Sequence, residues 1–72
     1  MPSKQHQYAA ATISGRQVAM LYARARQKGI RGWRNILEWL EFELDINVSE
    51  PEDIKSIDVD RIVAALDKKE TV

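Results

Sequence analysis

The sequence predicts a small all-α domain of three helices, with an extra single helical turn before the last helix. Apolar residues recur at helical spacing in three separate stretches, and capping residues mark where these stretches begin. A chain of 72 residues is long enough for one domain around a single core. We therefore expect helices near residues 15–28, 33–44 and 58–67 and the single turn at 50–54.

The first helix is the most completely specified element of the chain. Ser14 is a good N-cap, because its hydroxyl can accept a hydrogen bond from an early helical N–H group. Gln17 stands three residues later and completes a capping box, and Ile13 and Val18 occupy the two hydrophobic-staple positions. Gly29 follows the last periodic residue, where a left-handed cap is easiest without a Cβ atom.

The second helix carries two aromatic residues away from its apolar stripe. Trp39 and Phe42 fall on the same side as Asn35 rather than with the apolar residues. Either this helix lies between neighbours and is buried on more than one side, or the two aromatics form an exposed patch. Such a patch would bind a protein partner or a second copy of the chain. The acidic residues around it argue against contact with a phosphate backbone.

The segment before the last helix contains a second capping pattern. Ser49 and Glu52 have the spacing of a capping box, with room for one helical turn. The last helix begins at Ser56 or at Asp58. We favour Asp58, because Ile57 then occupies a hydrophobic-staple position.

Together the three apolar stripes and the connections between them predict one core. Its expected members are Ile13, Val18, Leu21, Tyr22, Ala25, Ile30, Trp33, Ile36, Leu37, Leu40, Leu44, Ile46, Ile54, Val59, Ile62, Val63 and Leu66. Residues 1–12 lack an amphipathic period and are expected to form a mobile tail. We expect the folded domain to span residues 13–67 and residues 68–72 to be frayed.

Charge is distributed very unevenly although the net charge is zero. Residues 1–34 hold seven basic residues and no acid, and residues 35–72 hold four bases and all eleven acids. Such a split can indicate a nucleic-acid patch, head-to-tail association, or helices that pair by charge within one small domain.

The first helix concentrates this positive charge. On a helical wheel, Met20 falls in the middle of an exposed basic face, between Arg16 and Arg24. A single surface methionine needs no function. Alternatively, this row is a contact surface with an adaptable apolar centre and charged flanks.

Several classes of function lack their chemistry here. There is no cysteine, the lone histidine His6 lies in the predicted tail, and the three glycines match no phosphate-binding motif. No nucleophile with a base, metal-ligand set or roomy pocket is expected. We therefore expect no catalytic residues, no metal, no cofactor and no small-molecule substrate. Because no run is long and apolar enough for a signal peptide or membrane span, the expected location is cytoplasmic.

The spacing I-S-x-x-Q-x-x-x-L-Y-A-x-A-x-x-K-G resembles the opening of a small helical domain at the C-terminal end of some phage single-strand annealing and related DNA-metabolism proteins. The resemblance spans about residues 13–66, but such domains tend to have glycine where Asp45 stands, and the large annealing domain is missing. It implies an accessory module that docks DNA or a DNA-processing protein. The matching residues are Ile13, Ser14, Gln17, Leu21, Tyr22, Ala23, Ala25, Lys28 and Gly29.

Two functions therefore compete. The favoured one is a protein-interaction module, with a protein partner or a homodimer held at Trp39 and Phe42. The alternative is a nucleic-acid-binding accessory protein, in which Trp33 would be the one aromatic residue beside the basic turn. Its contact residues, which would equally form a basic partner surface, are Arg16, Met20, Arg24, Arg26, Lys28, Arg31 and Arg34.

Overall fold

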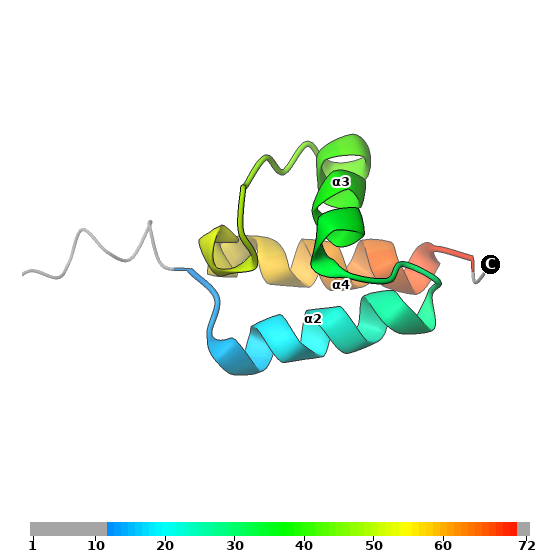
Figure 1. Cartoon of the computed structure of the whole chain (residues 1–72), viewed down its shortest axis with the longest axis horizontal. Helices are drawn as coiled ribbons and strands as arrows, with labels where there is room; N and C mark the ends of the chain where they lie inside the picture. Colours follow the sequence, from blue (N-terminus) through cyan, green and yellow to red (C-terminus); the bar gives the residue numbers. More distant parts are fainter. Residues whose placement is uncertain (1–11, 71–72) are drawn as a thin grey trace, which may run out of the picture.

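A computed structural model describes residues 12–70 and confirms the all-α fold (Figure 1). The predicted tail before Thr12 and the last two residues lie outside the described residues. Three α-helices and two short 3-10 helices follow one another along the chain. They are α2 (Gly15–Gln27), α3 (Trp33–Leu44), η1 (Pro51–Asp53), η2 (Ser56–Asp58) and α4 (Val59–Lys68).

Helices α2 and α4 lie side by side and run in the same direction, and α3 crosses them steeply (Figure 1). Two parallel helices cannot be joined by a tight turn, so α3 and the two 3-10 helices return the chain to the starting end. Helix α2 contacts α3, α4 and η1. The parallel arrangement brings the C-terminal ends of α2 and α4 together.

One core joins these elements, and every one of its fully buried residues was predicted. Between residues 12 and 70, no polar or charged residue is buried. Leu40 and Ile54 are completely inaccessible, which shows that the connection before α4 contributes to the core as well as the helices do. The buried residues are Ile13, Leu21, Ala25, Ile30, Ile36, Leu40, Ile46, Ile54, Val59, Ile62 and Leu66.

The edges of the core differ from the prediction at a few positions. Tyr22, expected in the core, is 37% exposed, because it lies at the edge of the apolar stripe of α2. Met20, Trp39 and Val48, which were not assigned to the core, are partly buried against it. The remaining predicted core residues are also partly buried there: Val18, Trp33, Leu37, Leu44 and Val63.

Both ends of α2 form as predicted. Ser14 Oγ accepts from the Gln17 N–H at 3.2 Å, and Gln17 Oε1 accepts from the Ser14 N–H at 3.1 Å. At the other end Gly29 has φ 91°, and the Ile30 N–H donates to the Ala25 carbonyl at 2.9 Å. This is the Schellman pattern, in which a left-handed glycine lets the chain turn back onto the last helical turn.

The second capping box is not formed. The residue that precedes η1 is Glu50 rather than Ser49, and no side chain caps this short helix. Asp58 directly precedes α4, as favoured, but its carboxylate pairs with Arg61 at 3.6 Å instead of capping the backbone. Its backbone is already helical, since η2 continues into α4, so the capping geometry is not available. Ile57 is 73% exposed and forms no staple.

The chain before α2 is attached to the segment between η1 and η2. The Ile13 N–H donates to the Ile54 carbonyl at 2.9 Å, and Thr12 forms an isolated antiparallel bridge with Lys55. Thr12, placed at the end of the predicted tail, is therefore part of the folded structure. These bonds hold the start of α2 against the connection that precedes α4.

Asp45 ends α3 in a conformation that normally belongs to glycine. Its φ is 57° and its ψ is 35°, in the left-handed region, and its N–H donates to the Glu41 carbonyl at 3.2 Å. The next N–H group, of Ile46, donates to the Leu40 carbonyl at 3.1 Å. The helix end is thus closed as a glycine would close it, although an acidic side chain there faces the negative end of the helix dipole.

Replacing Asp45 with glycine should therefore stabilise the domain. Asp45→Gly removes both the left-handed strain and the unfavourable charge, so we expect the free energy of unfolding to rise by about 0.5–1 kcal/mol. Asp45→Asn removes the charge alone and should give a smaller gain. Urea unfolding followed by circular dichroism measures both. A glycine variant no more stable than the asparagine variant would show that the backbone conformation carries no cost.

Candidate interaction site

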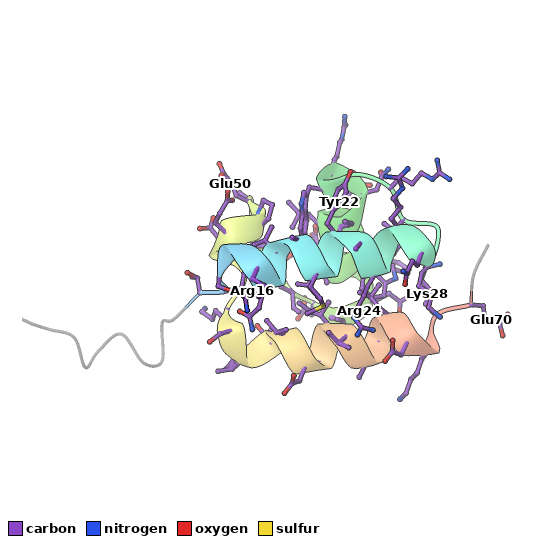
Figure 2. All side chains as sticks on the ribbon, turned by 90° about the horizontal axis from the view of Figure 1, so that it is seen from below. Arg16, Tyr22, Arg24, Lys28, Glu50 and Glu70 are labelled. Atoms are coloured by element: carbon purple, nitrogen blue, oxygen red, sulfur yellow. The ribbon has the colours of Figure 1, made fainter. Side chains whose placement is uncertain are left out.

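The predicted basic face is divided by the fold, and two of its members face α4 (Figure 2). Arg24 Nη1 lies 3.4 Å from Asp67 Oδ1, across the seam between α2 and α4. Lys28 Nζ donates to the carbonyl oxygens of Asp67 at 3.4 Å and Lys69 at 3.1 Å. A cation placed on the last carbonyl groups of a helix offsets the negative end of its dipole. These two residues therefore hold the end of α4 against α2.

Met20 also differs from its expected place. It is partly buried against the core rather than exposed in the centre of a basic face. Because Arg24, one turn further along, reaches Asp67 of α4, the row from Arg16 through Met20 to Arg24 follows the α4 side of α2. A helical wheel does not show which flank of an apolar stripe a neighbouring helix will cover. Met20 is partly buried because α4 covers its flank of α2.

A further cation serves the end of α3. Arg61 Nη2 donates to the Leu44 carbonyl at 2.6 Å, and Arg61 Nη1 lies 3.6 Å from Asp58 Oδ1. The side chain thus connects α4 to the last turn of α3. Its guanidinium group donates a hydrogen bond to one of the last carbonyl groups of α3, which have no partner within the helix.

All five arginines of the predicted basic surface are exposed, and four of them are not paired with α4: Arg16, Arg26, Arg31 and Arg34. Within residues 12–70 they form no salt bridge, and the possible surface pair of Arg34 with Glu38 is not made. Arg16 lies in the first turn of α2. The other three surround the connection between α2 and α3, and we call them the arginine patch.

Of the two predicted patch aromatics, one is partly buried and the other is exposed. Trp39 packs against the core, as expected for a helix covered on more than one side. Phe42, one turn further along α3, is 85% exposed. Burial on more than one side of the helix thus describes Trp39, and exposure of the aromatic patch describes Phe42. Phe42 forms a ridge between two open hollows that share Trp39 as a common wall.

The two hollows have different linings. The first, the acidic hollow, has a volume of about 720 Å³ and follows one side of α3. It is lined by Asn35, Glu38, Trp39, Glu41, Phe42 and Asp45. The second, the aromatic groove, has a volume of about 530 Å³ and lies between α3 and α4. It is lined by Trp39, Phe42, Glu43, Ala65, Lys68 and Lys69.

The chemistry available at this site is that of surface recognition. Phe42 offers an aromatic ring, Trp39 the apolar floor beside it, and the rims offer carboxylates on one side and ammonium groups on the other. In the described part of the chain, no three histidine, cysteine or carboxylate residues are grouped so that they could hold a metal ion. The arrangement suits an apolar anchor with charged neighbours.

The centre of this site could be predicted from the sequence, but its second wall could not. Trp39 and Phe42 stood out because they lie off the apolar stripe of their own helix. Ala65, Lys68 and Lys69 belong to α4, and only the packing of α4 beside α3 places them at the groove. Lysines at the end of a helix are accounted for by the helix dipole, so Lys68 and Lys69 gave no reason in the sequence to expect them beside an aromatic residue.

Comparison with known proteins adds no assignment. No family model matches this chain, and searches of curated proteins and of solved structures found no similar protein. The resemblance to the C-terminal domain of phage annealing proteins therefore stays a prediction. Between residues 12 and 70, no helix has the length and apolar character needed to cross a bilayer.

The structural role of Lys28 can be tested by removing its charge. Lys28→Met keeps the aliphatic chain and removes the donor to the two carbonyl groups, so we expect a loss of about 1 kcal/mol in the free energy of unfolding. Arg26→Met, two residues earlier and without a salt bridge between residues 12 and 70, should change stability by less than about 0.5 kcal/mol. Chemical denaturation measures both values, and equal losses would contradict the assignment.

Proposed function

We propose that this protein is a small non-enzymatic interaction module that docks a partner protein on the aromatic groove, with Phe42 as the anchor. The exposure of Phe42 carries this proposal. An aromatic ring that is 85% exposed on the surface of a well-packed helix contributes little to the fold. Large aromatic side chains beside a partly buried tryptophan are typical of the centre of a protein interface.

The charges around Phe42 favour a particular kind of partner. Glu38, Glu41 and Asp45 border one side of the ridge, and within residues 12–70 none of them forms an ion pair. A helical segment with one apolar anchor and with lysine or arginine residues along one flank would place its cations on this acidic rim, away from Lys68 and Lys69 on the far side of the groove. Charge complementarity of this kind raises the association rate and disfavours acidic partners.

The biological setting of the proposal is DNA processing, in replication or recombination. It rests on the resemblance to a domain of phage DNA-metabolism proteins, which the residues of α2 carry. In such a setting the module would recruit or position a larger protein. A second copy of this chain is the other occupant that the site suits, because the groove itself presents Glu43 together with Lys68 and Lys69.

A binding assay with designed peptides tests the proposal. The probes are two fluorescent amphipathic helical peptides with the same apolar anchor, one flanked by arginines and the other by glutamates. We expect the arginine peptide to bind more tightly. Phe42→Ala should weaken it by at least tenfold, as loss of a central aromatic anchor does. Ile57→Ala is the matched control, because Ile57 is another large apolar side chain, 73% exposed, outside the groove.

The control results distinguish the possible occupants. Equal weakening by Phe42→Ala and Ile57→Ala, or equal affinity for both peptides, would contradict the proposed site. Light scattering of the wild-type protein at rising concentration tests the second-copy alternative. If the wild-type protein forms a dimer and Phe42→Ala abolishes it, the occupant of the groove is a second copy of this chain rather than a different protein. Phe42→Ala should change the free energy of unfolding by less than about 0.5 kcal/mol, so loss of binding would not reflect unfolding.

A further inference from the structure

The surface around the connection between α2 and α3 combines exposed cations with an exposed aromatic ring. Tyr22 lies on the side of α2 that faces α3, whereas Arg24 and Lys28 point toward α4 (Figure 2). The ring of Tyr22 is 6.0 Å from the ring of Trp33, centroid to centroid, and the two planes are tilted by 37°. Trp33 is partly buried and supports Tyr22 from the core side.

The arginines of the patch lie near this aromatic pair in the chain. Arg26 follows Tyr22 by one helical turn and therefore lies on the same side of α2. Arg31 and Arg34 stand on either side of Trp33 in the chain, where the connection passes into α3. All three arginines are exposed. The patch thus supplies three exposed arginines, from α2, from the connection and from α3, all close in the chain to Tyr22 or Trp33.

The positive charge of this surface is not neutralised. There is no acidic residue between residues 12 and 37, and Glu38, the first acid that follows, does not pair with Arg34. On the α4 side the situation differs, because Arg24 pairs with Asp67 and Lys28 donates to the Lys69 carbonyl. Within residues 12–70, none of the three arginines of the patch forms a salt bridge, so the packing of the domain gives them no role.

We propose that this surface binds single-stranded nucleic acid, with the arginine patch on successive phosphates and one base stacked on Tyr22. Guanidinium groups bind phosphate oxygens through paired hydrogen bonds, and aromatic rings stack on any base without reading its sequence. In a duplex the bases are stacked on one another, so Tyr22 would have no base to contact. This site goes beyond the proposed function: it lies at the start of α3, about 12 Å along the helix axis from Phe42.

Fluorescence-anisotropy titration of the full chain with a labelled oligothymidine and an oligouridine tests the proposal. With three phosphate contacts on a single strand, affinity should fall about twentyfold between 50 and 200 mM salt. A duplex of the same length should bind more weakly at each salt concentration. No binding of either single strand at 50 mM salt would overturn the proposal, whereas the peptide assay at the aromatic groove would be unaffected.

Variants separate a built site from general attraction to a polyanion. Arg31→Gln should reduce the slope of log affinity against log salt by about 0.7, whereas Arg16→Gln, an exposed arginine on the α4 side of α2, should leave it unchanged. Tyr22→Leu retains an apolar contact for Trp33 and should weaken binding about fivefold or more. Equal effects of the two arginine variants, or an unchanged affinity in Tyr22→Leu, would contradict the proposed site.

Discussion

The other elements of the fold are arranged around the parallel packing of α2 against α4 (Figure 1). It places the negative ends of two helix dipoles at the same end of the molecule, a repulsive arrangement unless cations lie there. Lys28 reaches the last carbonyl groups of α4 from the end of α2 and supplies that charge. The parallel direction also requires a long return, and α3 crosses the pair to provide it (Figure 1).

This arrangement divides the positive charge of the first half of the chain into two parts. Arg24 and Lys28 face α4 and serve the fold, as expected if helices pair by charge within one domain. Arg26, Arg31 and Arg34 lie on the other flank, around the connection to α3, and remain available. A neutral protein can thus present a local cationic surface.

Local rules predicted the elements and the buried core well. The capping box at Ser14 and the glycine turn at Gly29 formed because their partners lie within a few residues. What could not be predicted depends on how the helices are placed. Met20 is partly buried because α4 covers one flank of α2, and Tyr22 is exposed because it lies at the edge of the stripe on the other. The second wall of the aromatic groove, on α4, likewise appears only after packing.

Some arginines thus pair within the fold, and we propose that others are free to bind a ligand. Nuclear magnetic resonance of the arginine Nε–Hε groups, recorded with and without oligothymidine, distinguishes the two sets. The side chains of Arg26, Arg31 and Arg34 should be mobile in the free protein, and their chemical shifts should change when the oligonucleotide is added. Those of Arg24 and Arg61 should stay where they are. Shifts centred on Arg24 and Arg61 instead would show that the arginines paired within the fold are the ones that bind.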